Sequence, residues 1–181
     1  PVVNSLGVIS NLSVSNSNCN NIYIGFRASL YNIYLRNNPS FTNVNFHNHS
    51  EAYDISIEDS VVGGLHFGQY SQVYDFKIKH SNVNNFTLQE NSYTESVMFE
   101  LSRVNGVVIG DGGAFVSVFV KEDSILQNIN LNSYMYNLFL SQGSSLINLN
   151  DSSGTYGFED VYIAKGFVLN FQNAALTEEY S

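Results

Sequence analysis

Apolar residues in this chain recur in short, regularly spaced runs, and the clearest copies lie next to each other between Ser71 and Leu88. The segments Ser71–Ile78 and Ser81–Leu88 share the form Ser-x-Φ-x-Asn/Asp-Φ-x-Φ, in which Φ is an apolar residue. The form recurs along most of the chain, in steps that alternate between about ten and eleven residues. Two unequal halves therefore make one repeat of about 21 residues, which is typical of a solenoid.

Each half-repeat has the composition of a short β-strand followed by a turn. β-branched and aromatic residues in an apolar-x-apolar pattern favour strands, and the Ser, Asn, Asp and Gly residues between them favour turns. Because so short a strand cannot bury its apolar face alone, successive copies must stack and share one core. The sequence therefore predicts an all-β fold, a β-solenoid (β-helix) of about eight coils, each made of two short-strand halves.

Polar residues one coil apart support this stacking, because they are expected to lie above one another and to bond along the stack. The predicted serine columns are Ser29, Ser50, Ser71 and Ser92 at one corner and Ser60, Ser81, Ser102 and Ser124 at the other. The predicted amide and carboxylate ladders are Asn32, Asp54 and Asp75, and Asn21, Asn43 and Asn85.

The repeat weakens towards the C-terminus. Asp151 and Asn173 fall at positions where apolar residues are expected, and residues 174–181 show no repeat. We therefore expect a regular β-solenoid over residues 1–150, followed over residues 151–181 by irregular last coils and a C-terminal cap or tail.

The outward positions differ between the two halves of the repeat. One half carries amides and small residues, and the other carries an aromatic wall, formed by Tyr31, Tyr34, Tyr53, Tyr74, Met98, Phe119, Tyr136, Phe139 and Tyr162. An apolar strip of this length exceeds what soluble monomers usually expose. We expect it to be covered by another copy of the chain, as a trimer or a fibre, or to bind a cell-surface glycan through stacking of sugars on phenol rings.

Composition narrows the functional classes. Charged residues make up only 13% of the chain, and a net charge of -9 without a basic stripe argues against nucleic-acid binding. The single cysteine, Cys19, lies at an apolar position and is expected to be a core residue. No apolar run reaches membrane-spanning length, so we predict no membrane insertion. No signal peptide is visible and the pattern is already present near Pro1, which suggests a mature or excised segment.

Two groups of residues are candidates for catalysis or metal binding. Asp54 and Asp75 occupy equivalent positions in successive coils, at a separation that would suit paired carboxylates of a glycoside hydrolase, but Asn or Ser fills this column elsewhere and favours a turn role. His47 and His49 could chelate a metal, but no third ligand is fixed by the sequence. We therefore predict no catalytic residues, no metal and no cofactor, with an enzyme using Asp54 and Asp75 as the alternative.

The repeat, with its serine corners, asparagine ladders and tyrosine-rich exterior, resembles the β-helical shafts of bacteriophage tail fibres and tailspikes. This resemblance implies homotrimers, a virion location and attachment to surface polysaccharide. Some members carry depolymerase carboxylates, and no residue set here maps onto them. The coil length is also similar to that of curli-type fibre subunits, but the inward Gln and the Gly-x-Gly of that repeat are missing.

Together these observations predict a non-catalytic structural and adhesive module of a virion fibre or cell-surface appendage, located outside the cell or on a virion. A self-assembling extracellular fibre subunit is a further alternative, because open solenoid ends expose strand edges that can template the next copy.

Overall fold

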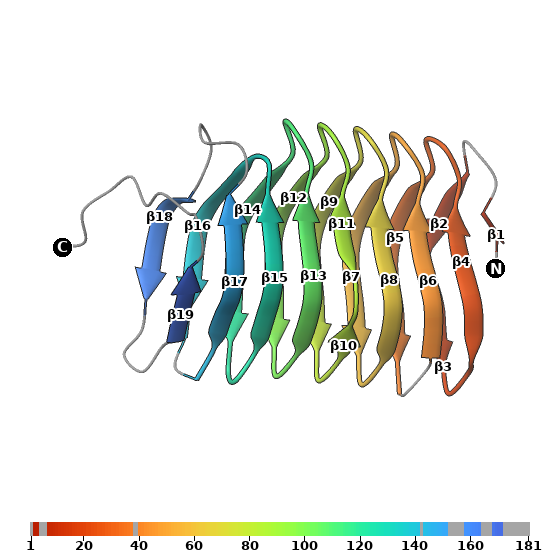
Figure 1. Cartoon of the computed structure of the whole chain (residues 1–181). Helices are drawn as coiled ribbons and strands as arrows, with labels where there is room; N and C mark the ends of the chain where they lie inside the picture. Colours follow the sequence, from red (N-terminus) through yellow and green to blue (C-terminus); the bar gives the residue numbers. More distant parts are fainter. Residues whose placement is uncertain are drawn as a thin grey trace.

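The computed structural model describes residues 2–3, 7–37, 40–141, 143–151, 158–163 and 168–171, and these are all-β. Parallel strands stack into a β-solenoid of about seven turns with a spacing of about 21 residues, which confirms the predicted fold class and repeat length (Figure 1). Residues one coil apart are paired in register, as in the series Val62, Val83 and Val104. The described part of the chain contains no helix with the length and apolarity of a membrane span.

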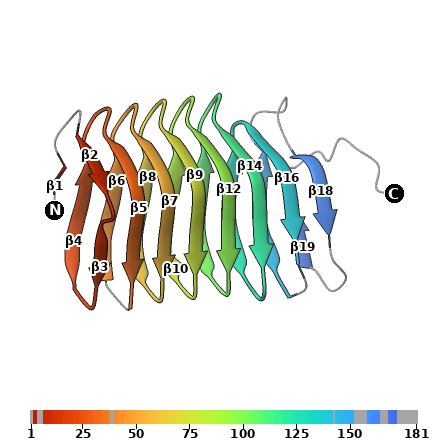
Figure 2. The ribbon, with the colours of Figure 1, turned by 180° about the vertical axis from the view of Figure 1, so that it is seen from behind.

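Every complete coil contributes to two parallel sheets. Sheet 1 contains β1 (Val2–Val3), β4 (Cys19–Ile24), β6 (Ser40–Phe46), β8 (Val61–Phe67), β10 (Asn82–Val83), β11 (Phe86–Leu88), β13 (Arg103–Ile109), β15 (Ile125–Leu131), β17 (Ser145–Asp151) and β19 (Val168–Phe171). Sheet 2, which lies in front in Figure 2, contains β2 (Val8–Ser10), β3 (Ser13–Ser15), β5 (Ser29–Arg36), β7 (Glu51–Glu58), β9 (Gln72–Lys79), β12 (Tyr93–Glu100), β14 (Ala114–Lys121), β16 (Tyr134–Leu140) and β18 (Phe158–Ile163).

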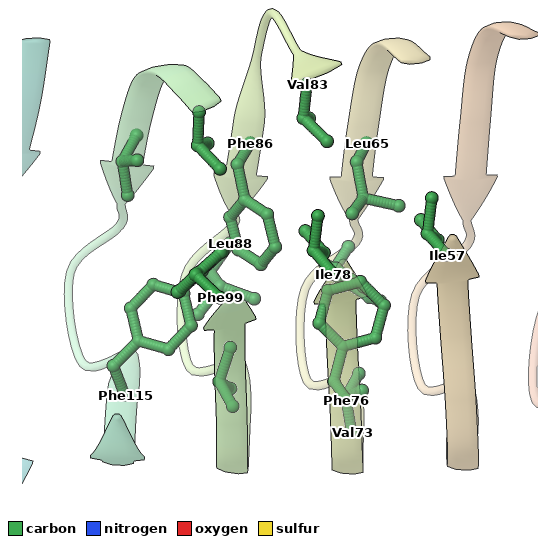
Figure 3. Close-up of a cluster of buried hydrophobic side chains, with 14 of the residues drawn as sticks. Ile57, Leu65, Val73, Phe76, Ile78, Val83, Phe86, Leu88, Phe99 and Phe115 are labelled. Atoms are coloured by element: carbon green, nitrogen blue, oxygen red, sulfur yellow. The ribbon is translucent and has the colours of Figure 1, made fainter. Parts of the chain in front are cut away.

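The core is a single apolar layer between the two sheets. Inward side chains from both sheets interdigitate there, and phenylalanines fill its middle (Figure 3). Phe86, for example, lies 5.2 Å from Phe115 and 6.0 Å from Phe76 between ring centroids, and all three rings are fully buried. Burial of this layer is the main force that holds the coils together.

At the corner that leads from sheet 2 to sheet 1, the predicted serine ladder is present. The backbone N–H of Ser60 donates to the hydroxyl of Ser81 at 3.1 Å, and Ser81 and Ser102 repeat this bond to the next coil at 3.2 Å each. The hydroxyls of these three serines donate in turn to carbonyls two residues earlier. These bonds satisfy polar groups of the buried turns within the protein.

At the opposite corner the predicted serine column is wrong at one position, Ser29. Ser50, Ser71 and Ser92 are buried in the turn, but the equivalent position in the coil before them is Ala28, and Ser29 lies in β5 opposite Glu51. The cause is one extra residue between β5 and β6, because β5 ends at Arg36 and β6 begins at Ser40, whereas only two residues separate β7 from β8. That coil is 22 residues long, so an exact 21-residue step points one position too late.

The chain continues the solenoid past residue 150. β18 pairs with β16, and β19 pairs with β17 after a register shift between Ile147 and Leu149. Asn173 and the tail 174–181 lie outside the described residues, and the predicted boundary at residue 150 stays a prediction.

Candidate binding surface on the outer face of sheet 2

The outer face of sheet 2 carries two columns of outward side chains, set by the register of its strands. One column runs through Tyr31, Tyr53, Tyr74, Glu95, Val116 and Tyr136. The other runs through Tyr34, Ser56, Lys77, Met98, Phe119, Phe139 and Tyr162. All nine residues of the predicted aromatic wall therefore lie on one sheet, in two adjacent columns.

The first column contains a stack of three tyrosines, which we call the tyrosine stack. The centroids of Tyr31 and Tyr53 lie 5.1 Å apart with ring planes within 5°, and those of Tyr53 and Tyr74 lie 5.0 Å apart within 9°. These separations are close to the spacing between strands, about 4.8 Å. The rings therefore stack along the solenoid axis, each above the ring of the coil before.

The second column contains a similar stack near the C-terminus. Phe139 lies between Phe119, at 4.7 Å, and Tyr162, at 4.8 Å, with ring planes within 7° and 6°. Tyr162 remains 54% exposed. The two stacks lie in different columns and at opposite ends of the sheet.

Stacking changes what this surface offers to a ligand. In the middle of each stack both faces of a ring are covered by neighbouring rings, and Tyr53 and Phe139 are accordingly only partly exposed. A sugar binds an aromatic side chain through the ring face, whereas a flat partner can pack against ring edges. The wall is therefore a surface of ring edges, with free faces only where a stack ends.

Charged side chains interrupt the columns in the middle of the sheet. Lys77 and Glu95 are the outward residues of the two columns on neighbouring coils. Glu95 accepts a hydrogen bond at 2.9 Å from the hydroxyl of Tyr93, whose ring is tilted against Tyr74. Burial, and after it this hydrogen bond, raise the pKa of Tyr93 to about 12. Burial and the charge of Glu51 also raise the pKa of Tyr53.

A row of alternating charges follows the C-terminal ends of these strands. It consists of Arg36, Glu58, Lys79, Glu100 and Lys121. Lys79 forms an ion pair with Glu100 at 3.3 Å, and the guanidinium of Arg36 lies 4.5 Å from the ring centroid of Tyr34. The row gives one edge of the aromatic surface a sign that changes with every coil.

Asp54 and Asp75 lie at equivalent positions of successive coils, at a point where the backbone is left-handed. Both are exposed and both have a left-handed conformation, with φ of 53°. The same position holds Asn32, Ser96, Ser117 and Asn137 in other coils, always with positive φ. Asn and Asp tolerate this conformation better than most residues, so their presence here has a conformational reason.

The two histidines of the predicted pair make different contacts. His49 stacks on Tyr70 at 4.9 Å and meets the edge of Phe26 at 5.4 Å, while His47 supplies a carbonyl to Ser50. Among the described residues, no three or more His, Cys, Asp or Glu side chains gather as a metal site.

Comparisons with protein-family models, with curated proteins and with solved structures find no match for this chain. The site must therefore be interpreted from its own geometry.

The outer face of sheet 1 is the amide face that the sequence predicts. Asn43 donates to Asn21 at 3.1 Å and Asn128 donates to Asn105 at 2.6 Å, so amides bond along the stack. Asn85 departs from its predicted ladder and donates to the carbonyl of Gly63. Burial lowers the pKa of His66 on this face.

Sequence reasoning missed four features of the surface. Glu95 is polar, so the spacing of apolar and aromatic residues does not reveal that it belongs to the first column. Tyr93 and Arg36 lie at strand ends, and Tyr70 lies at a corner, outside the repeat's defining positions. The period of Arg36, Glu58, Lys79, Glu100 and Lys121 was present in the sequence as alternating charges at steps of 21 or 22 residues.

Proposed function

We propose that this chain is a non-catalytic structural and adhesive module of an extracellular or virion-borne assembly, and that it associates with copies of itself through the outer face of sheet 2. The observation that carries the proposal is the pair of aromatic stacks, which present ring edges near both ends of one face of the solenoid, at Tyr31, Tyr53 and Tyr74 and at Phe119, Phe139 and Tyr162. Exposed apolar surface of this extent marks interaction sites in soluble proteins.

A second copy of the chain fits this face better than an unrelated partner. The charge row changes sign with each coil, so two copies packed face to face and displaced by one coil bring Glu58 or Glu100 opposite a Lys or Arg. Charge complementarity of this kind selects the register of association more than it adds affinity. The flat surface of ring edges supplies the apolar contact.

The test is the solution mass, measured by light scattering over a range of concentrations, for the native chain and two matched variants. Phe139→Lys places a cation inside the second aromatic stack, whereas Asn130→Lys places one on the exposed amide face. We expect a discrete oligomer for the native chain and Asn130→Lys, and a smaller species for Phe139→Lys. A native chain that is monomeric at every concentration would overturn the proposal.

End-to-end growth is a second candidate, favoured by the state of the first coil. The apolar residues Ile9, Leu12, Val14 and Cys19 pack on the core but stay only partly buried, so this coil keeps some apolar surface exposed. The same experiment distinguishes the two, because a mass that grows without limit and is insensitive to Phe139→Lys indicates stacking of solenoid ends.

A polysaccharide-degrading enzyme that uses Asp54 and Asp75 is the rival from another class. Asp75→Asn tests it cleanly, because Asn32 and Asn137 already occupy the same left-handed position. Release of new sugar ends from a polysaccharide panel, abolished in Asp75→Asn without a change in stability, would favour the enzyme over the proposed module.

A further inference from the structure

The tyrosine stack ends in a step on the outer face of sheet 2. Strand register places Ser10 next to Tyr31 and Ser13 next to Tyr34. The rings stack along the solenoid axis, so the face of Tyr31 that is turned away from Tyr53 is directed towards the coil that holds these serines. A serine side chain is too short to cover it, and Tyr31 is 39% exposed while Ser10 and Ser13 are exposed.

This step, which we call the ledge, offers the one uncovered end of the tyrosine stack. At the other end, the ring of Tyr93 is packed against Tyr74 at 5.9 Å. Hydroxyls of Ser10 and Ser13 form the floor of the ledge. Beside them, Asn11 accepts a hydrogen bond from Asn32 at 3.0 Å through its Oδ1, which leaves the N–H groups of its amide available to a ligand.

Arg36 lies on the same strand as Tyr31 and has no carboxylate partner among the described residues. The guanidinium of Arg36 lies over the ring of Tyr34, and its Nε is a buried nitrogen with no hydrogen-bond partner in the structure. Glu58 in the next coil accepts a hydrogen bond from Ser56 and forms no ion pair with Arg36 among the described residues. The remaining N–H groups of this partly exposed guanidinium can therefore donate to a carboxylate of a ligand, for which arginine has a matching geometry.

The charge distribution along the chain gives this end of the rod a distinct character. All 16 acidic residues lie at or beyond Glu51, whereas Arg27 and Arg36 precede it. The first coils therefore carry no negative charge that would repel an anion, although the chain as a whole has a net charge of -9.

We propose that the ledge binds an acidic oligosaccharide that lies along β2 and β3, with a C–H face of one sugar on the free face of Tyr31 and the carboxylate of a later sugar at Arg36, five residues further along the extended strand β5. Ser10, Ser13 and Asn11 supply hydrogen bonds to sugar hydroxyls. The sugar that lies on Tyr31 occupies the place that a further tyrosine would take in the stack. This inference rests on the adhesive part of the proposed function and is independent of self-association.

The experiment measures binding by isothermal titration with two probes of equal length, a tetrasaccharide of galacturonic acid and one of neutral galactose. Ser10→Tyr is the decisive variant, since its ring would continue the stack and fill the ledge without removing any native contact. We expect the native chain to prefer the acidic probe, and Ser10→Tyr to bind it at least about tenfold more weakly, a change of about 1.4 kcal/mol. The melting temperature of Ser10→Tyr should be unchanged or raised.

Arg36→Gln separates charge recognition from stacking. It should weaken binding of the acidic probe by about tenfold or more and abolish the preference over the neutral probe. Arg103→Gln, which alters an exposed arginine on sheet 1, is the matched control and should bind as the native chain does.

Two results would overturn the ledge, and a third would overturn its preference for an acidic ligand. Acidic-probe binding that is unchanged in Ser10→Tyr would place the adhesive site elsewhere and leave the proposed function standing. Equal affinity for both probes would remove the role of Arg36. No binding of either probe by the native chain would overturn the ledge, and it would remove the adhesive part of the proposed function only if the polysaccharide panel also showed no binding.

Discussion

The two outer faces of the solenoid are built on backbones that differ in regularity. In sheet 2 every described coil from the first to that of β16 has one left-handed residue in the middle of the outward strand, namely Asn11, Asn32, Asp54, Asp75, Ser96, Ser117 and Asn137. In sheet 1 the left-handed conformation occurs at Gly106, Asn128 and Asn148, but Asn43 and Asn85, at the same position of earlier coils, do not adopt it.

This difference explains why the rings gather on sheet 2. A flat ring can stack on the ring of the next coil only if both backbones present it in the same direction, and the repeated kink of sheet 2 provides that condition. Sheet 1 changes its mid-strand geometry once along the stack, between Asn85 and Gly106, and short amides tolerate such a change because they can turn to find a partner. Regular backbone therefore accompanies aromatic stacks, and irregular backbone accompanies amide bonds.

The largest expected loss of stability comes from a close approach of two backbones in sheet 1. A Cβ on Gly63 would collide with the backbone carbonyl oxygen of Thr42 in the neighbouring strand, and backbone cannot move aside as a side chain can. We expect Gly63→Ala to lower the free energy of unfolding by about 3 kcal/mol. Thr87→Ala, on the same outer face, is the control and should change it by less than about 0.5 kcal/mol. Urea unfolding followed by circular dichroism measures both; equal effects would show that the close approach at Gly63 is unimportant.

The second prediction compares how much side chains on the two outer faces contribute to the free energy of unfolding. Tyr53→Ala removes two stacked contacts, with Tyr31 and Tyr74, and should cost about 2 kcal/mol of unfolding free energy, since an aromatic pair contributes about 0.5–1.5 kcal/mol beyond its burial. Asn45→Ala, at an outward position of sheet 1, should cost no more than about 0.5 kcal/mol. If the two variants were equally stable, the stacks would owe nothing to ring contacts, and stacking would be a passive result of register.

The inward half of this architecture could be predicted from sequence because burial fixes it. Apolar-x-apolar runs with turn residues between them specify which side chains enter the core, and the serine ladder of Ser60, Ser81 and Ser102 follows from the same step. A constant step fails where a turn gains one residue, which is why Ser29 was placed in a corner that Ala28 occupies.

The candidate site was predictable only as a set of residues. Sequence assigns Tyr31, Tyr53 and Tyr74 to one outward column, but whether their rings stack or splay depends on side-chain torsions that no spacing encodes. The ledge depends on a contrast between neighbouring coils, a short Ser10 below a long Tyr31, and a search for repeats passes over contrasts. The unsatisfied Nε of Arg36 is visible only when the surrounding atoms are placed.

The third expected effect is a pH response of opposite sign on the two faces. The pKa of Tyr93 is raised to about 12 in the folded chain, against about 10 for a free phenol. The folded state holds this proton more tightly, so its contribution to stability is complete below about pH 10 and is lost as the pH rises towards about 12. Melting temperatures measured from pH 8 to 12 should fall less steeply for Tyr93→Phe than for the native chain.

Sheet 1 supplies the matching response in acid. Burial lowers the pKa of His66, so the folded state binds this proton less readily than the unfolded chain, and stability falls as the pH drops below about 6.5. His66→Gln should flatten this acid limb and leave the alkaline limb unchanged, while Tyr93→Phe should do the reverse. A variant that altered both limbs would show that the two faces do not titrate independently.

The smallest expected effect concerns the charge row at the edge of sheet 2. Lys79 and Glu100 approach to 3.3 Å, but their side chains keep 32% and 22% exposure, so water and salt screen the attraction. Lys79→Ala should lower the unfolding free energy by less than about 1 kcal/mol, and the loss should shrink in 1 M salt. Arg103→Ala, an exposed cation on sheet 1, should show no such salt dependence.

If the charge row serves mainly to set the register between copies, Lys79→Ala should change the mass distribution in solution more than it changes the melting temperature, because an exposed ion pair contributes little to folding but opposes misaligned partners.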